Sequence, residues 1–248
     1  TTKSDNPINY TKNMKSNSQI RREARKNLSG FAYDGQPLSG SYPESKWGTF
    51  VIMTFLYMLI SSVAQTPMNI GEVLMENDSF FSIAATLTFI SIGLIFLCLP
   101  MSWGYSVSFL EHHRKQPVDI DRLFAGYRQF GRIFVAYLLI FVYTFLWTLL
   151  FIIPGIVKSY SYAMTPYILA DHPELSGEQA ICRSMAMMQG NKLRLFLLHL
   201  SFIGWAILAT LTCGIGFLWL YPYIYASMAV FYEDVKKDFE EKYATAEA

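Results

Sequence analysis

Carboxylate and imidazole side chains follow three of the long apolar segments of the chain. They form the runs Glu111-His112-His113, Asp171-His172 and Glu233-Asp234. Carboxylate and imidazole groups together suit a divalent metal ion, so a metal site could form if the three segment ends converged around one axis. The candidate ligands are Glu111, His112, Asp171, His172 and Glu233. No single run has metal-ligand spacing, and polar residues also end any membrane-crossing helix, so both interpretations stay open.

Two further ionisable residues fall within apolar segments. Lys158 follows Pro154-Gly155, where a broken helix would expose backbone groups to an anionic solute or a lipid phosphate. The alternative is a lysine that extends to the lipid headgroups. His199 is flanked by leucines, and an ionisable side chain at membrane depth is a candidate for proton transfer. The alternative is a neutral, hydrogen-bonded histidine near the inner interface, because Arg194 lies only about one turn away.

The sequence lacks the common catalytic and ligand-binding motifs. It contains no Gly-x-Ser-x-Gly, no phosphate-binding glycine loop, no His-Glu-x-x-His and no aromatic-basic nucleic-acid pattern. Its three cysteines, at positions 98, 182 and 213, lie far apart and give neither metal spacing nor a disulfide framework. We therefore predict no catalytic residue, no cofactor and no nucleic-acid partner, and we favour a protein that is not an enzyme.

Residues 1–46 form a polar N-terminal region with one basic amphipathic helix and a turn-rich loop at 31–46. In the helix, Ile20, Ala24 and Leu28 recur every four residues, which places them on one face. The basic residues on its other faces are Arg21, Arg22, Arg25 and Lys26. Such a helix suits the anionic headgroups of a membrane surface. The alternative is a charged helix that is simply solvated.

The composition indicates an all-α, polytopic membrane protein. The 248 residues are 52% hydrophobic and 16% charged, whereas soluble domains carry about 25% charged residues. A helix needs about 20 apolar residues to cross a bilayer, and we predict a membrane domain at 47–232 and a charged tail at 233–248. The six predicted spans are 47–64, 80–110, 133–153, 156–170, 195–211 and 215–232.

The distribution of positive charge predicts the orientation. With six spans, nineteen of the twenty Lys and Arg residues fall on one side of the membrane, and only Lys158 falls on the other. Because cytoplasmic segments carry the excess of Lys and Arg, we predict that both termini and the residues 111–132 and 171–194 are cytoplasmic. The spans then form three hairpins, joined by short cytoplasmic amphipathic helices.

The three hairpins resemble one another, which suggests an internal repeat. Each follows a segment that ends near a glycine, at Gly30, Gly126 and Gly190. Each returning helix ends in a bulky apolar run and an acid. Such short matches also arise by chance, so the alternative to a triplication is coincidence.

A longer pattern connects the chain to a known family. The run IIPGIVKSYSYAMTPYILADHPELSGEQAICRSMAMMQGNKLRLF, followed by LSFIGW, LTCGIG and FYED, resembles the bacterial integral-membrane family catalogued as domain of unknown function 975. The resemblance covers at least 124–234, and more weakly the basic helix at 21–30, whereas the 31–46 loop departs from it. It implies a bacterial cytoplasmic membrane and brings no activity, substrate or catalytic residue.

Three functions are compatible with these features. We favour a non-enzymatic membrane protein that binds anionic lipid headgroups, a protein partner or a second copy of itself through its basic cytoplasmic face. The second is a small-solute or ion transporter or channel, which would need a water-accessible cavity reaching His199 or Tyr160. The third is a lipid-active membrane enzyme.

Overall fold

The computed structural model describes residues 14–29, 46–75 and 81–246. It is 86% helical, and the described residues contain no strand, so the all-α prediction is confirmed. The predicted loop at 31–46 lies outside the described residues, apart from Lys46.

Eleven helical elements follow one another along the described chain. The N-terminal half contains α1 (Asn17–Ser29), α2 (Trp47–Met75), α3 (Phe81–His113), the 3-10 helix η3 (Ile120–Gln129) and α4 (Phe130–Leu150). The C-terminal half contains α5 (Ile152–Tyr162), α6 (Thr165–Asp171), α7 (Gly177–Met187), α8 (Lys192–Leu200), α9 (Ile203–Leu211) and α10 (Phe217–Ala246).

Four helical segments are long and apolar enough to cross a membrane, not six. They are Trp47–Leu74, Ser82–His113, Ile120–Leu150 and Lys192–Leu211. Large apolar side chains on them are exposed, with Phe89 at 74%, Leu149 at 74% and Leu211 at 75%. Contiguous exposed apolar surface of this kind is what a lipid-facing helix presents. The predicted fourth and sixth spans are not among these four helices.

The predicted fourth span, 156–170, is broken into α5 and α6. Ser184 of α7 stabilises the break, because its Oγ donates to the Ser161 carbonyl (2.8 Å) and accepts from the Met164 N–H (3.2 Å). The helix α6 then packs in the protein interior against α3 and α7, and Trp103 Nε1 donates to the Pro166 carbonyl (2.9 Å). The predicted fourth span is therefore split into two helices, α5 and α6, each of which is shorter than a single spanning helix.

The predicted sixth span, 215–232, is the first half of α10. Tyrosines and Pro222 interrupt its apolar character, and α1 packs along it. Tyr223 already contacts α1, through a hydrogen bond from its hydroxyl to the Arg21 carbonyl (3.3 Å). Only the few residues from Phe217 to Pro222 extend beyond that contact, about 9 Å of helix at 1.5 Å per residue. The predicted sixth span is therefore part of one longer helix, α10, which also packs against α1.

The first span continues well beyond the predicted end at Ala64. Pro67 lacks an N–H and cannot donate a helical hydrogen bond. Next to it, the Ser91 side chain of α3 bonds to two backbone groups of α2. Its Oγ accepts from the Met68 N–H (2.8 Å) and donates to the Ala64 carbonyl (3.1 Å). The Met68 N–H and the Ala64 carbonyl are therefore both hydrogen-bonded, and α2 continues past Pro67 to Met75.

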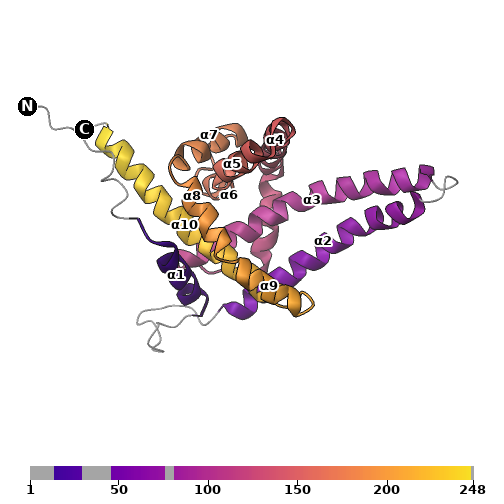
Figure 1. The fold of residues 1–248 in the computed structure, drawn as a ribbon, viewed down its shortest axis with the longest axis horizontal. Helices are drawn as coiled ribbons and strands as arrows, with labels where there is room; N and C mark the ends of the chain where they lie inside the picture. The colour runs from indigo at the N-terminus through magenta and orange to yellow at the C-terminus, as the bar shows by residue number, and fades with distance from the viewer. Residues whose placement is uncertain (1–13, 30–45, 76–80, 247–248) are drawn as a thin grey trace, which may run out of the picture.

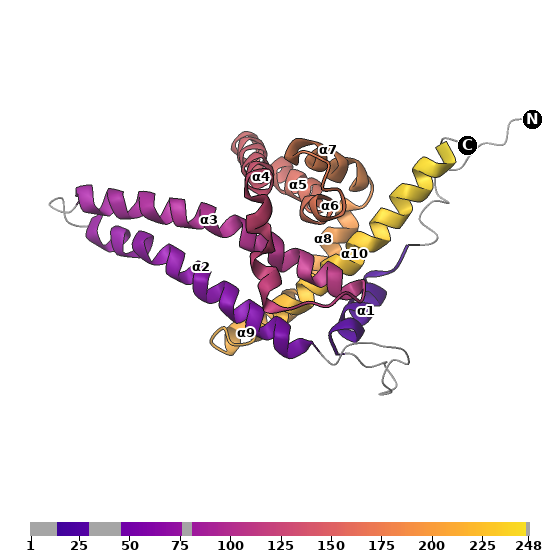
Figure 2. The ribbon, with the colours of Figure 1, turned by 180° about the vertical axis from the view of Figure 1, so that it is seen from behind.

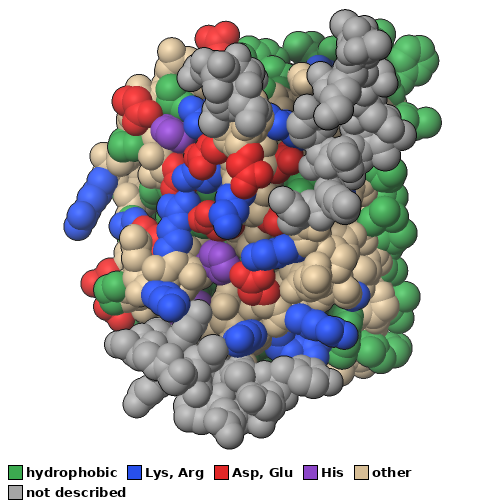
Figure 3. All heavy atoms as spheres, turned by 90° about the vertical axis from the view of Figure 1, so that its left-hand side faces the viewer, with side chains coloured by type: hydrophobic (Ala, Val, Ile, Leu, Met, Phe, Trp, Pro, Cys, Tyr) green, Lys and Arg blue, Asp and Glu red, His purple; other side chains and the backbone are tan. Residues whose placement is uncertain are grey.

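The helices α2 and α3 form a long pair that projects from the rest of the molecule (Figures 1 and 2). At the other end of the molecule, α1 lies beside α10 in both views. Figure 3 shows that end face: Lys, Arg, Asp and Glu side chains cover its middle, and hydrophobic side chains appear mainly at its edge. The charged groups therefore gather on one face, opposite the tip of the α2–α3 pair.

The 3-10 helix η3 packs unusually close to α3. A Cβ added to Gly126 would lie 2.8 Å from the Pro100 carbonyl carbon, and one added to Gly104 would lie 2.7 Å from the Arg122 carbonyl oxygen. Tyr127 of η3 also donates to the Leu97 carbonyl (2.9 Å), one turn before Pro100. The two glycines therefore permit a backbone contact that no larger residue would allow.

Candidate functional site

Arg114 joins two of the three predicted segment ends. Its guanidinium contacts the Asp171 carboxylate in a bidentate pair (2.5 and 2.8 Å) and donates to Glu233 through Nε (2.6 Å). Asp171 also accepts from Lys236 Nζ (2.7 Å) and from the Tyr232 hydroxyl (2.8 Å). Asp171 and Glu233 therefore converge, and they do so around cationic side chains.

The remaining candidate metal ligands have other partners. Glu111 pairs with Arg122 (Oε2–Nε, 2.6 Å). His112 bonds through Nε2 to the Asn27 carbonyl (2.9 Å), and His172 bonds through Nδ1 to Glu174 (2.9 Å). Within the described part of the chain, no three His, Cys, Asp or Glu side chains lie close enough to hold a metal ion together. These contacts fit ion pairing better than metal binding.

Ion pairing changes the ionisation of this cluster. Burial opposes the charge on Asp171, but the hydrogen bonds from Arg114, Lys236 and Tyr232 outweigh it and hold the pKa of this carboxyl well below its usual range. The Asp171 carboxylate in turn raises the pKa of the Arg114 guanidinium. Burial, followed by the Asp171 charge, raises the pKa of the Tyr232 phenol. All three groups therefore keep their present charge states across the physiological pH range.

The basic helix α1 is fixed to α10 by its apolar face. Ile20, Ala24 and Leu28 are fully buried, and α1 packs mainly against α10. At its N-terminal end, the Lys15 N–H donates to both Asp234 oxygens (3.2 Å each). The same carboxylate pairs with Arg194. The apolar face of α1 is therefore occupied by protein.

The basic residues of α1 differ in their surroundings. Arg22, Arg25 and Lys26 are exposed, whereas Arg21 is half-buried. Arg25 lies over the Tyr223 ring, with its guanidinium carbon 5.5 Å from the ring centroid, and donates to the Tyr223 hydroxyl (3.4 Å). Three of the four charges are thus available to a ligand outside the protein, and one of them is oriented by α10.

A groove of about 660 Å³ opens beside Arg25, between α1, α9 and α10. We call it the Arg25 groove. Three of the five tryptophans of the chain line it, and Arg25 is its one charged lining residue among those described. Its lining is Arg25, Ser29, Trp47, Trp205, Leu208, Ala209, Thr212, Gly216, Trp219, Leu220 and Tyr223. The groove thus offers one cationic group next to a mainly apolar, aromatic surface.

Lys158 and His199, the two ionisable residues within apolar segments, both contact aromatic rings. Lys158 Nζ lies 4.8 Å from the centroid of the Trp147 ring, a cation–π geometry. The His199 ring lies 5.7 Å from that of Tyr160. Neither His199 nor Tyr160 lines the Arg25 groove or the cavity between α2, α3 and α10.

The sequence analysis missed Arg114, Lys236 and Tyr232, which surround Asp171. A signal was present, because acids that converge in a buried place need cations to offset their charge. Arg114 directly follows the run that contained two candidate ligands, and Lys236 lies three residues after Glu233. Nothing in the spacing of these residues, however, indicated which carboxylate each would contact.

Comparison with known proteins gives one match. No curated protein and no solved structure matches the chain. A family model described as "Protein of unknown function (DUF975)" matches residues 149–238, from the end of α4 to the middle of α10. This match confirms the resemblance to that family over this segment of the chain.

Proposed function

We propose that the protein is a non-enzymatic integral membrane protein of the bacterial cytoplasmic membrane that binds anionic lipid in the Arg25 groove. One observation carries the proposal: a single exposed arginine, oriented by Tyr223, lies at a groove that is otherwise lined mainly by apolar and aromatic side chains. An acyl chain fits such a surface, and a lipid phosphate fits the guanidinium. The volume of about 660 Å³ lies in the range of ligand sites.

The neighbouring charges support an anionic ligand over a neutral one. Arg22 and Lys26 are exposed on the same helix as Arg25, so they add positive charge that favours an anionic ligand over a neutral one. Tryptophans such as Trp205 and Trp219, both about half exposed, favour the interface between hydrocarbon and headgroups. The groove therefore matches the two-part chemistry of an anionic lipid.

The proposal is tested by measuring the lipid selectivity of the full-length protein. An isolated α1 peptide would not serve, because it would expose the apolar face that α10 covers in the protein. Tryptophan fluorescence of the protein in nanodiscs is measured while brominated phosphatidylglycerol or brominated phosphatidylcholine replaces part of the lipid. We expect stronger quenching by the anionic lipid, and we expect Arg25→Gln to reduce this preference roughly five-fold, equivalent to about 1 kcal/mol.

Arg22→Gln is the matched control, since it removes the same charge from the same helix at a position that does not line the groove. It should keep most of the preference. Equal losses in the two variants would indicate general surface attraction and exclude a site at the groove. Equal quenching by the two lipids in the unaltered protein would contradict lipid selectivity altogether.

We further propose that both termini and the charged face lie on the cytoplasmic side, with Glu72 outside. The charge partition supports this orientation, as does the convergence of Arg114, Asp171 and Glu233. With the native cysteines replaced by serine, Glu72→Cys should react with an impermeant thiol reagent in intact cells. Gln116→Cys should stay protected until the membrane is permeabilised. The reverse pattern would show that the orientation is inverted.

A further inference from the structure

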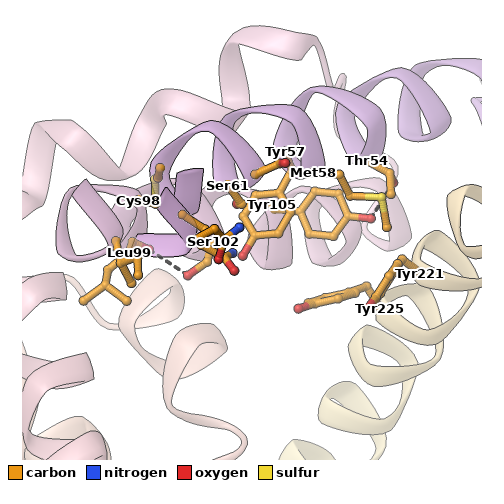
Figure 4. A pocket seen from close by; sticks show the side chains of 15 residues that line it. Thr54, Tyr57, Met58, Ser61, Cys98, Leu99, Ser102, Tyr105, Tyr221 and Tyr225 are labelled. Carbon is orange, nitrogen blue, oxygen red and sulfur yellow. Dashed lines mark hydrogen bonds between the residues drawn. The ribbon is translucent and has the colours of Figure 1, made fainter. Parts of the chain in front are cut away.

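A second cavity, of about 610 Å³, lies between α2, α3 and α10. Figure 4 shows side chains of α2 and α3 on one side of it and Tyr221 and Tyr225 of α10 across from them. The lining residues of α2 and α3 fall within the candidate spans Trp47–Leu74 and Ser82–His113. The cavity is thus separate from the Arg25 groove and lies on segments at membrane depth.

The lining is polar without being charged. The fifteen described residues that line the cavity include no Asp, Glu, Lys, Arg or His. They include hydroxyl, amide and phenol groups, among them Thr54, Tyr57, Gln65, Asn69, Tyr105 and Tyr225. An ion entering this space would lose hydration without gaining an opposite charge, which is costly. The cavity therefore suits a neutral ligand that forms several hydrogen bonds.

Three tyrosine rings form a wall of this cavity. The Tyr57 and Tyr105 rings stack with centroids 5.4 Å apart, and the Tyr225 ring meets Tyr105 edge-on at 4.8 Å. Tyr105 is only 1% exposed, so neighbouring groups hold it in place. A fixed aromatic surface of this kind binds the apolar face of a ring-shaped ligand.

The hydrogen bonds of Tyr105 indicate which groups the ligand must carry. Thr54 Oγ1 donates its proton to the Phe50 carbonyl (2.7 Å). Tyr105 must then be the donor in its bond with Thr54 Oγ1 (2.6 Å), because a hydroxyl has one proton. The remaining lone pairs of the Tyr105 oxygen can only accept. A ligand that engages this oxygen therefore needs a donor such as a hydroxyl, which a quinone carbonyl cannot supply.

Other groups in the cavity can both donate and accept. The amides of Gln65 and Asn69 and the hydroxyl of Tyr225 have no hydrogen-bond partner within the described part of the chain. Each amide offers two donor hydrogens and an acceptor oxygen. A ligand with many hydroxyl groups around an apolar ring face would pair with these groups and pack on the tyrosines.

Sugars have this combination of features. We propose that the cavity binds the hexose ring of a neutral saccharide, either a free sugar or the headgroup of a glycolipid. The tyrosine wall contacts the C–H face of the ring, while Tyr105 accepts from one of its hydroxyls. Gln65, Asn69 and Tyr225 pair with the others. This site is independent of the anionic-lipid site, since the two share no lining residue.

Binding is measured on the full-length protein in a detergent without a sugar headgroup, because glucoside and maltoside detergents would compete for the cavity. The probes are radiolabelled methyl α-glucoside in equilibrium dialysis and monoglucosyl diacylglycerol in mixed micelles. We expect saturable binding of at least one probe, weakened roughly ten-fold in Tyr225→Leu. Gln65→Leu, at an exposed position of α2, should also weaken binding without affecting folding.

Tyr143→Leu is the control, because Tyr143 is a half-buried tyrosine of α4 that does not line the cavity. Binding of both probes would support recognition of the hexose itself, and binding of the lipid-linked probe alone would support a glycolipid source. The proposal would be overturned if neither probe bound, if benzoquinone displaced the sugar, or if Tyr143→Leu weakened binding as much as Tyr225→Leu and Gln65→Leu. None of these results depends on the selectivity for anionic lipid.

Discussion

Replacing Asp171 by asparagine should destabilise the folded protein by about 3 kcal/mol. The Asp171 side chain is only 6% exposed and accepts hydrogen bonds from Arg114, Lys236 and Tyr232. Asparagine would occupy the same space but leave two cationic groups without their shared counter-ion. The free energy of unfolding is measured by titrating detergent-solubilised protein with SDS and following helicity by circular dichroism.

Glu174→Gln is the matched control. Glu174 also belongs to an ion pair, with His172, but its side chain is 65% exposed, and exposed pairs contribute little. Its change in stability should be much smaller than that of Asp171→Asn. Similar values for the two variants would mean that Asp171 has no special role in joining α3, α6 and α10.

The same contacts predict a pH dependence. Because Asp171 has a lowered pKa in the folded protein, its contribution to stability is complete above the pKa of the unfolded chain, about 3.9. It declines as the pH falls below that value towards the folded pKa. Between pH 6 and pH 3, the unaltered protein should therefore lose more stability than Asp171→Asn does. Parallel curves for the two proteins would contradict the assignment.

Gly126→Val should produce a loss of about 3 kcal/mol or more. A Cβ at this position would lie 2.8 Å from the Pro100 carbonyl carbon, well inside van der Waals contact. The obstacle is backbone, so it cannot move away by changing a rotamer. The helix η3 would have to move off α3, and the Tyr127–Leu97 hydrogen bond would be lost with it. The SDS titration described for Asp171 measures the effect.

Gly131→Ala is a control on the neighbouring helix. Nothing lies within 4 Å of a Cβ built at Gly131, and alanine is favoured over glycine in a helix by about 1 kcal/mol. This variant should be neutral or slightly stabilising. If Gly126→Val were equally well tolerated, the close packing of η3 on α3 would not be required for folding.

Hydropathy alone predicted the helical fold but not where the apolar segments break or pack against protein. At 156–170 and 215–232, the hydropathy of the sequence is the same whether lipid or protein surrounds the segment. Ser184, which pairs both ends of the α5–α6 break, lies on a different helix and gives no local signal. The charge partition, by contrast, was counted on six membrane crossings and used charges as well as hydropathy. It correctly placed Arg114, Asp171 and Glu233 on the same side of the molecule.

The candidate sites were predictable to different degrees. The spacing of Ile20, Ala24 and Leu28 identified the buried face of α1 and hence its exposed charges. It could not indicate that this face packs on α10, since that contact joins residues about two hundred positions apart. The sugar cavity was not foreseen at all. Its hydroxyls and tyrosines are scattered over three helices and form no pattern in any one of them. The threefold repeat stays a prediction.

The packing of α1 on α10 has a consequence for biosynthesis. Arg25 and Tyr223 are 198 positions apart, and ribosomes add about 5–20 residues per second. About 10–40 s therefore pass between the synthesis of Arg25 in α1 and that of Tyr223 in α10. During this interval α10 does not yet cover the apolar stripe of α1, and the nascent helix can rest on the membrane surface through Ile20, Ala24 and Leu28. Translation of α10 then transfers the same stripe from lipid to protein, so the synthesis of α10 converts a surface-bound helix into a structural one.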